Sequence, residues 1–229
     1  MKALIVEDEP QTVEAVSLIF KLRWPEVEVL STTSGSEAAP MVEKESPDVV
    51  ILDLGLPDVD GIEVLKEIRA FSDVPIVIVT ARGDSISQVK GLELGADDYV
   101  TKPFDPGLLL VRVKNAVAHA RIPVNQAAAP FTAGNLIIDF ANRRVSFQGK
   151  PLDLTPTEYR LLCHLARNAG RVLSHENILR AVWGEGYEGD LTILKSCIYR
   201  LRRKLAEAGA DSEIISSEPG KGYKFFIPS

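Results

Sequence analysis

The chain has 229 residues, 45% of them hydrophobic, so it can bury the core of one large domain or of two ordinary ones, which excludes disorder as the default. Its apolar runs are far too short to cross a bilayer, and acidic residues at Glu7–Glu9 interrupt the first of them, so we expect a cytoplasmic protein with no leader peptide and no membrane segment. The net charge of −6 hides an asymmetry, because residues 1–121 carry 12 basic and 21 acidic side chains whereas residues 122–229 carry 14 and 11.

That asymmetry gives net charges of −9 and +3 for the two halves. An acidic half joined to a basic half indicates two domains with different partners, the basic one suited to an anionic surface such as nucleic acid. Cys163 and Cys197 lack the spacing of a zinc site or a disulfide framework. We therefore expect both to be buried thiols.

The first half alternates short β-branched runs with helix-length segments about five times. Unbroken apolar strands in such an alternation predict a doubly wound α/β domain, in which helices cover both faces of a five-stranded parallel sheet. A helix is expected at Pro106–Ala120. The expected strands are Ala3–Val6, Val27–Leu30, Val49–Leu52, Ile76–Val79 and Tyr99–Val100.

Polar side chains follow these strands at the points where the strands end. Glu7 and Asp8 follow the first strand and Asp53 follows the third, and these ends are neighbours in a sheet that begins with strand order 2-1-3. Three converging carboxylates repel one another unless a cation neutralises them, and oxygen ligands suit Mg²⁺. Thr80 and Lys102 follow at the same edge. Each residue alone is typical of a solvated loop, but together they predict phosphoryl transfer, which depends mostly on positioning and charge neutralisation.

The residues lie in segments that resemble a response-regulator receiver domain, over about residues 1–120. The resemblance implies a flavodoxin-like fold in which Asp53 accepts a phosphoryl group from a sensor histidine kinase. It implies that Asp8, Asp53 and the Gly55 carbonyl ligate Mg²⁺, with Glu7 holding the ion through water. The segments are Ile5-Val6-Glu7-Asp8-Glu9, Ile51-Leu52-Asp53-Leu54-Gly55-Leu56-Pro57, Asp60-Gly61, Val79-Thr80-Ala81, Gly95-Ala96-Asp97-Asp98-Tyr99 and Thr101-Lys102-Pro103-Phe104.

The same resemblance implies a switch. Lys102 and Thr80 would contact the phosphoryl oxygens, and Tyr99 would be the aromatic residue whose ring turns inward when Thr80 moves. Aspartyl phosphate adds about one to two negative charges and new acceptor oxygens, which attract an ammonium and a hydroxyl group. Without its neighbours Tyr99 would be interpreted as a half-buried edge-strand aromatic.

Residues 121–130 have no amphipathic period and are bounded by prolines, so we expect a linker between a first domain at 1–120 and a second at 131–229. The second domain begins with expected strands at Leu136–Phe140 and Val145–Phe147, and it closes with a hairpin of Ile214–Ser216 and Tyr223–Ile227. Three helical patterns lie between them. The first follows Leu154–Glu158, the second opens at Arg171–Ser174 and runs to Trp183, and the third is Leu191–Ala206. Strands, then helices, then a hairpin predict a small α+β domain.

The third helical pattern is strongly basic. Its apolar residues fall on one stripe, and the opposite arc carries a face of one charge sign, which fits phosphate neutralisation and entry into the major groove. A basic helix that docks on an acidic protein is the ordinary alternative. The predicted DNA contacts are Thr192, Lys195, Ser196, Tyr199, Arg200, Arg202, Arg203 and Lys204 on this helix, with Lys221 at the glycine-tipped hairpin.

The second half resembles the winged-helix effector domain of OmpR/PhoB-type response regulators across residues 131–228. The segments that carry this resemblance are Leu-Thr-Pro-Thr-Glu-Tyr-Arg-Leu-Leu at 154–162, Ala181-Val182-Trp183-Gly184, Arg200-Leu201-Arg202-Arg203-Lys204-Leu205 and Gly220-Lys221-Gly222-Tyr223. The resemblance implies a transcription regulator that binds double-stranded DNA, contacts RNA polymerase and forms a homodimer when phosphorylated. Accordingly, we expect no enzyme activity beyond slow self-dephosphorylation.

Several positions depart from the family pattern. Pro219 stands where an arginine usually precedes the Gly-x-Gly-Tyr turn, and Lys195 and Cys197 stand where an acid and a histidine are frequent. Gln88 and Leu108 lack the charges that often pair between receivers, whereas the Asp98 and Arg112 positions match. We therefore expect an unusual sequence preference and a weaker or more apolar receiver dimer.

Two other functions compete with this interpretation. A haloacid-dehalogenase-like phosphatase also uses a strand-end aspartate and Mg²⁺, but it normally needs a second acid two residues on, and Asp53-Leu54-Gly55 lacks one. A phosphorylation-controlled adaptor would bind protein or RNA through the basic domain. Salt-dependent binding to duplex DNA, absent with single-stranded RNA, would separate the adaptor from a transcription regulator.

Overall fold

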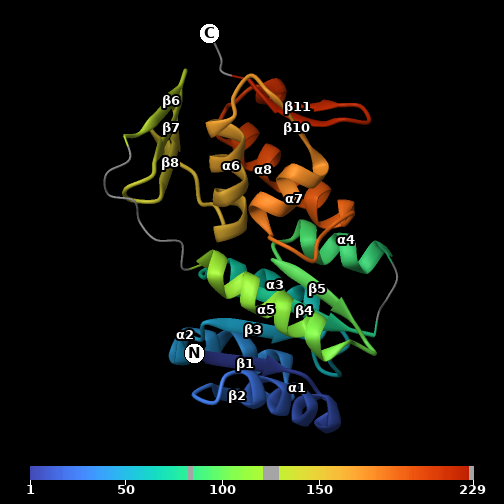
Figure 1. Ribbon diagram of the computed structural model, residues 1–229. Helices are drawn as coiled ribbons and strands as arrows, with labels where there is room; N and C mark the ends of the chain where they lie inside the picture. The colour runs from blue at the N-terminus through green and yellow to red at the C-terminus, as the bar shows by residue number, and fades with distance from the viewer. Residues whose placement is uncertain (82–84, 121–128, 227–229) are drawn as a thin grey trace. The chain divides into compact units, whose positions relative to one another are not determined.

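The computed structural model describes residues 1–81, 85–120 and 129–226, and the chain divides into two compact units, Met1–Ala120 and Arg121–Ser229 (Figure 1). Of the predicted linker at 121–130, residues 121–128 lie outside the described residues. The side chains of residues 85, 86, 119 and 212 are also not described.

The first unit is built on a five-stranded parallel sheet. Its strand order is β2-β1-β3-β4-β5, so the predicted 2-1-3 start is confirmed. The strands are β1 (Lys2–Val6), β2 (Glu28–Thr32), β3 (Val49–Leu52), β4 (Ile76–Thr80) and β5 (Asp98–Thr101), and the helices are α1 (Pro10–Arg23), α2 (Ala38–Glu45), α3 (Gly61–Arg69), α4 (Ser85–Glu93) and α5 (Pro106–Ala120), with a short 3₁₀ turn η1 (Gly35–Glu37) before α2.

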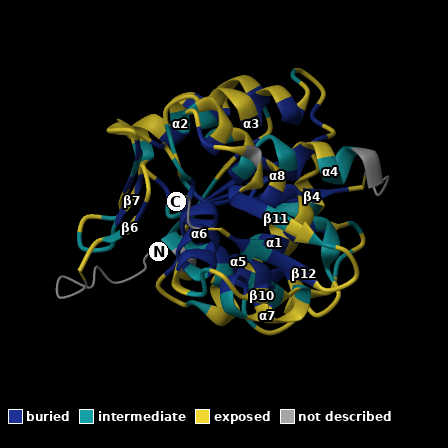
Figure 2. Ribbon diagram, turned by 90° about the horizontal axis from the view of Figure 1, so that it is seen from above, coloured by how far each residue is buried: buried dark blue, intermediate teal, exposed yellow. Residues whose placement is uncertain are grey.

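Alternate strand residues supply the core on each face of this sheet. Ala3 and Ile5 of β1 pack in one cluster with Phe20 of α1 and Val113 of α5, so those two helices cover one face. Strands β1, β3 and β4 are almost entirely buried, and β4 is dark blue, meaning buried, in Figure 2, whereas β2 is only partly buried and the outer sides of α2 and α3 are exposed. Because both faces are covered, the loops at the strand ends carry the accessible chemistry.

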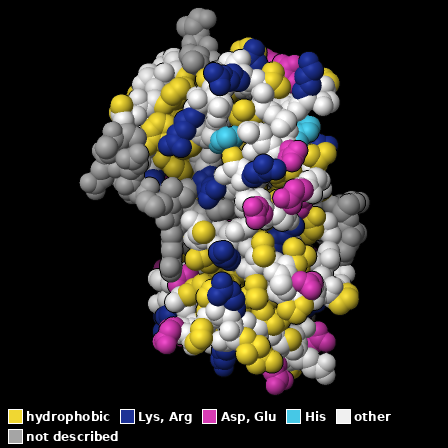
Figure 3. Space-filling view, in the orientation of Figure 1, with side chains coloured by type: hydrophobic (Ala, Val, Ile, Leu, Met, Phe, Trp, Pro, Cys, Tyr) yellow, Lys and Arg dark blue, Asp and Glu magenta, His cyan; other side chains and the backbone are white. Residues whose placement is uncertain are grey.

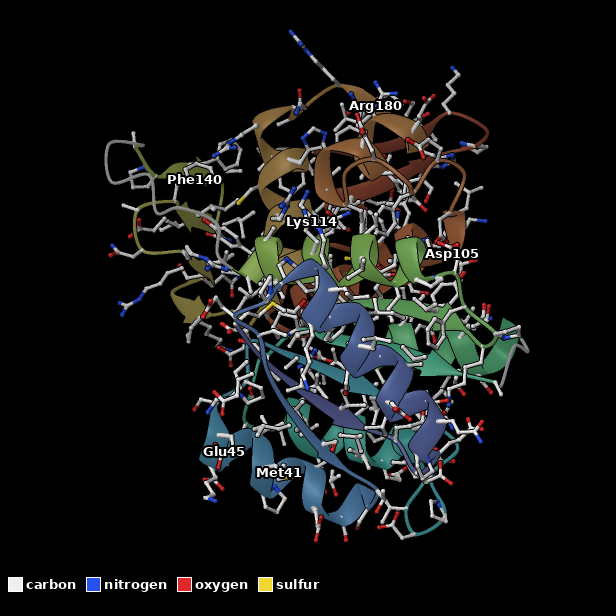
Figure 4. All side chains as sticks on the ribbon, turned by 60° about the horizontal axis from the view of Figure 1, so that its bottom comes forward. Met41, Glu45, Asp105, Lys114, Phe140 and Arg180 are labelled. Carbon is white, nitrogen blue, oxygen red and sulfur yellow. The ribbon has the colours of Figure 1, made fainter. Side chains whose placement is uncertain are left out.

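Capping residues fix where the helices begin. The Asp60 side chain accepts a hydrogen bond from the Ile62 amide at 2.9 Å at the start of α3. Asp105 likewise accepts from the Leu108 amide at 2.8 Å at the start of α5; Figure 4 shows Asp105 at this end and Lys114 further along the helix. Side-chain acceptors satisfy amide groups that the first helical turn leaves unpaired.

The second unit contains two antiparallel sheets and three helices within the described residues. One sheet has the order β6-β7-β8-β9 and the other β10-β12-β11. The strands are β6 (Phe131–Ala133), β7 (Leu136–Asp139), β8 (Arg144–Phe147), β9 (Lys150–Pro151), β10 (Val172–Ser174), β11 (Ile215–Glu218) and β12 (Gly222–Phe225); the helices are α6 (Pro156–Arg167), α7 (His175–Val182) and α8 (Leu191–Glu207), with a 3₁₀ turn η2 (Ser212–Ile214). The α+β prediction is confirmed.

One predicted boundary in this unit is wrong. Arg171–Ser174 was expected to open the second helix, but Val172–Ser174 form β10 and pair with β12. The helix begins only at His175, because the Ser174 hydroxyl caps it by accepting a hydrogen bond from the Asn177 amide at 3.2 Å. The closing hairpin, defined here as β11, β12 and the turn between them, has strands at 215–218 and 222–225; Ile227 lies outside the described residues.

Candidate metal centre and nucleic-acid interface

An acidic pocket lies at the carboxyl ends of β1 and β3. Val6 and Leu52 are register partners at the ends of these strands, and the Asp53 amide donates to the Val6 carbonyl at 3.0 Å, which draws the two following loops together. Carboxylate oxygens of Glu7, Asp8 and Asp53 lie within 4.8 Å of one another. Glu7 and Asp53 are buried and Asp8 is exposed.

Two further strands bring a cation and a hydroxyl group to the pocket. Lys102 follows β5, and its Nζ donates to Asp53 Oδ2 at 2.7 Å and also to Glu7 Oε2. The Thr80 hydroxyl, at the end of β4 and only 1% exposed, hydrogen-bonds the Asp53 carboxylate. The structure therefore brings together all five residues that the sequence predicted for this site.

Burial and the ammonium group act in opposite directions on the two buried carboxylates. Burial, reinforced by the neighbouring Asp53 charge, raises the pKa of Glu7 above its ordinary value. Burial also disfavours the Asp53 carboxylate, but hydrogen bonds from Lys102, the Gly55 amide and Thr80 outweigh it and lower the pKa of Asp53. Asp53 is therefore the more acidic carboxyl group of the two, and a nucleophile must be deprotonated.

The donor set fits a hard divalent cation. Three carboxylates supply only oxygen ligands, and the surrounding pocket of about 480 Å³ is open on one side, which leaves room for water and a phosphoryl group. The Gly55 amide donates to Asp53 Oδ1 at 2.9 Å, so Gly55 lies beside the carboxylate and lines the pocket. Lys102 neutralises part of the negative charge.

Tyr99, the predicted switch residue, is half-buried on β5, and its amide donates to Asp98 Oδ1 at 2.8 Å. Asp98 and Arg112, expected on a dimer face, are instead buried and form an ion pair with each other at 3.4 Å. That pair joins β5 to α5 within the unit. Leu108, on the same helix, is 39% exposed.

Helix α8 presents a short exposed stripe. Lys195, Tyr199 and Arg203 are exposed at spacings of four residues, so they lie one above another on one face. The Arg203 guanidinium lies 6.0 Å from the centre of the Tyr199 ring. Thr192 is half-buried one turn before this stripe. Figure 3 shows both basic and acidic side chains on the visible face of the second unit.

Two predicted DNA contacts are corrected by burial. Arg200 is 3% exposed and its Nε donates to Glu158 Oε1 at 2.8 Å, and Ser196 is 4% exposed. Neither side chain is available to a duplex. Lys204 is partly committed in the same way, because its Nζ donates to Glu158 Oε2 at 2.8 Å and to the Asp153 carbonyl at 2.6 Å.

Glu158 is the residue whose importance the sequence did not indicate. Its side chain is fully buried, reaches back to the Thr155 amide at 3.0 Å in a capping box, and accepts from Arg200 and Lys204. Thr-Pro-Thr-Glu predicted the helix start, but the tertiary ion pairs were missed. Five cations on α8 with one acid among them would have been the available signal, since buried cations require partners.

Arg202 is engaged with the closing hairpin. Its Nε and Nη2 both donate to the Ile215 carbonyl, at 2.9 and 2.6 Å, and Nη2 also donates to Ser217 Oγ at 3.0 Å. The turn of the hairpin closes by a hydrogen bond from the Lys221 amide to the Glu218 carbonyl at 2.9 Å, and the Lys221 side chain is exposed there.

Cys163 and Cys197 are buried thiols, as predicted. Within the described residues, no helix has the length and apolar character needed to cross a membrane.

Comparisons with known proteins agree with this architecture. Residues 3–114 match the family described as "Response regulator receiver domain", and residues 149–225 match "Transcriptional regulatory protein, C terminal". The transcriptional regulatory protein KdpE of Mycobacterium tuberculosis is 36% identical over 222 residues, covering 97% of each chain. BaeR of Escherichia coli is 38% identical over 224 residues, covering 98% of this chain and 92% of BaeR. A solved RitR mutant covers 98% of both chains with a TM-score of 0.77 at 24% identity, which supports the fold alone.

Proposed function

The chain belongs to the two-component response regulators of the OmpR/PhoB type, with a receiver domain and a DNA-binding effector domain, and on that premise we propose that phosphorylation of Asp53 controls its binding to specific duplex DNA. The observation that carries the proposal is the buried Asp53 carboxylate, which accepts hydrogen bonds from Lys102 and Thr80 and lies beside two further acids. A sensor histidine kinase is the phosphoryl donor. We infer a cytoplasmic location, because the protein would meet both the kinase and the DNA there.

The transfer at Asp53 needs little beyond positioning. A carboxylate oxygen of Asp53 forms the new O–P bond as the N–P bond of the phosphohistidine breaks, and the released imidazole nitrogen takes up a proton. Lys102 already donates to Asp53 Oδ2 at 2.7 Å and can follow the new phosphoryl oxygens, as can the Thr80 hydroxyl. Fixed donors aimed at developing charge lower the barrier without reorganisation.

Mg²⁺ is the cofactor that the acidic pocket suits. Asp8, Asp53 and the Gly55 carbonyl would hold it, with Glu7 contributing through water. The ion would supply charge neutralisation for the incoming phosphoryl group. We expect slow hydrolysis of the aspartyl phosphate at most, with no turnover on a free substrate.

Phosphorylation acts through Thr80 and Tyr99 in this proposal. Movement of the buried Thr80 hydroxyl toward a phosphoryl oxygen would leave space beside the half-buried Tyr99 ring, which would turn inward. The altered surface near β5 and α5 would then favour a receiver homodimer. Two effector domains joined in this way bind two half-sites. Binding of the second half-site is then intramolecular, which raises the overall affinity, and the bound dimer recruits RNA polymerase.

The effector domain reads DNA through α8 and the closing hairpin. Lys195, Tyr199 and Arg203 form the exposed stripe that would enter the major groove, with Thr192 beside it. Lys221, at the hairpin turn, would contact the backbone or minor groove. Arg202 and Lys204 lie half-buried at the edge of this surface.

Two measurements test the proposal. Acetyl phosphate with Mg²⁺ should add one acid-stable, hydroxylamine-labile phosphoryl group to the wild type and none to Asp53→Asn; undiminished labelling of the variant would overturn the assignment. Selection from random duplex DNA should yield a defined operator with direct-repeat half-sites about one helical turn apart. Binding of single-stranded RNA in preference to every duplex would instead favour an adaptor.

A further inference from the structure

The cations of α8 do not all face outward. Arg200 is buried against Glu158, and Lys204 donates to the same carboxylate. Arg202 donates three hydrogen bonds to the closing hairpin, two to the Ile215 carbonyl and one to Ser217 Oγ. Its guanidinium also lies 5.7 Å from the centre of the Tyr223 ring, a residue of the opposite hairpin strand. Arg202 therefore touches both strands of the hairpin.

Strand β12 of the hairpin is held by backbone pairing with β10 up to the turn, where Gly222 pairs with Ser174. Gly222 begins β12, and a Cβ at this position would lie 1.8 Å from the Leu173 carbonyl oxygen of β10, so only glycine lets these strands approach. The tip lies beyond the paired residues: Gly220 has φ of 71°, and a Cβ there would meet nothing within 4 Å. Because the tip projects from the sheet, its placement depends on what holds the strands behind it.

Arg202 has the geometry for that task. Its planar guanidinium directs two N–H groups at one carbonyl oxygen, which lysine, with a single ammonium nitrogen, does not reproduce. These N–H groups point at the hairpin and are engaged with it rather than with a phosphate. We propose that Arg202 is a positioning residue that fixes the closing hairpin against α8, so that Lys221 and the exposed stripe of α8 engage the same duplex together.

This inference rests on the proposed DNA-binding function and adds to it a coupling between two contact surfaces. A hairpin tip that is already placed loses less conformational freedom when it binds. Removing the Arg202 contacts should therefore weaken binding through Lys221, even though Arg202 itself touches no DNA. If Arg202 were a phosphate contact, its loss would instead be independent of Lys221.

A double-mutant cycle on the full-length, beryllofluoride-activated protein separates these cases. Arg202→Lys keeps the charge but loses the forked contact, so it should weaken binding to the selected operator about tenfold, the effect of losing roughly one charge-assisted hydrogen bond. In a Lys221→Ala background the same change should cost less than about twofold, because the contact it positions is already gone. The inference would be overturned if the fold-loss of affinity in the double variant equalled the product of the losses in the two single variants.

A second readout and a milder variant guard against misfolding. Ser217→Ala removes one acceptor on the hairpin side and should act in the same direction as Arg202→Lys, again only while Lys221 is present. Hydroxyl-radical footprints should lose the hairpin's protection while protection by α8 persists; loss of both together would contradict positioning. Arg180→Lys on exposed α7, a matched charge-preserving control, should bind like the wild type (Figure 4). Failure of the wild type to bind any duplex would instead refute the proposed function.

Discussion

Glu158→Gln tests the buried network that holds α6 to α8. Glu158 has no exposed surface and pairs with Arg200, whose side chain is 4% exposed, and with Lys204. The substitution would leave the Arg200 charge buried without its counterion, which costs about 3–5 kcal/mol when one partner of a buried pair is removed. A domain of this size has only about 5–15 kcal/mol of stability, so the effect should be large.

The assay is urea unfolding followed by tryptophan fluorescence. Trp183 lies in the second unit and is 1% exposed, so in a Trp24→Phe background it alone reports on that unit. Glu207→Gln is the matched control, because Glu207 is 68% exposed and faces Arg203 at 3.6 Å. Loss of such a surface pair should change the free energy of unfolding by less than about 1 kcal/mol.

The stability difference between wild type and Glu158→Gln should depend on pH in a defined direction. Burial favours the neutral acid, but the charges of Arg200 and Lys204 outweigh it and hold the pKa of Glu158 below its ordinary value. A lowered folded-state pKa adds stability above the unfolded-state pKa, and that stability is lost as pH falls through the folded-state value. The difference between wild type and Glu158→Gln should therefore be largest near neutral pH and shrink below about pH 4. Equal losses for Glu158→Gln and Glu207→Gln at pH 7 would refute this reasoning.

Three further predictions concern the two sites. Lys102→Met should raise the pKa of the phosphoacceptor carboxyl, because burial is then opposed by fewer donors; a carbon-detected NMR titration with unchanged pKa would contradict this. Gly222→Ala should destabilise the second unit, because its Cβ would overlap a β10 carbonyl, whereas Gly149→Ala, with nothing within 4 Å of the added Cβ, should cost only the strain of its positive φ; equal unfolding midpoints would be inconsistent with that packing. Arg203→Ala should cost about 1–3 kcal/mol at particular base pairs, whereas Lys204→Ala should weaken all operators alike, and identical behaviour on every operator variant would show the division to be wrong.

The receiver site could be predicted from the sequence, because parallel strands bring their carboxyl ends to one edge of the sheet. Once Val49–Leu52 was recognised as a buried strand, Asp53 had to follow it at that edge, beside the acids after the first strand. No tertiary detail beyond strand order was needed. Local sequence patterns were likewise enough to predict α5 and the capped start of α6.

The DNA-binding surface of the effector domain was harder to predict from the sequence, because it depends on contacts between residues far apart in the chain. Arg200 is next to the apolar stripe of α8, and only its pairing with Glu158, 42 residues earlier, explains why it is buried. Val172–Ser174 were misassigned because a three-residue strand directly before a capped helix has no period of its own; its pairing with β12 decides its conformation. In both cases the deciding partner lies far along the chain.

In the proposed mechanism, pairing of two receiver domains brings two effector domains to one operator. Asp98 and Arg112 are buried and form an ion pair with each other within the receiver, so we expect any receiver homodimer to rely on exposed apolar residues such as Leu108. Sedimentation with and without beryllofluoride and Mg²⁺ should show a monomer converting to a dimer. A monomer in both conditions at tens of micromolar would require another mode of activation.

The proposed control of DNA binding by phosphorylation of Asp53 can be measured on the intact protein. Its most direct test is the affinity for the selected operator, measured by fluorescence anisotropy before and after treatment with acetyl phosphate and Mg²⁺, for the wild type and for Asp53→Asn. Treatment should tighten operator binding by the wild type and leave binding by Asp53→Asn unchanged. Equal affinities of the treated and untreated wild type, or an equal gain in the variant, would contradict it.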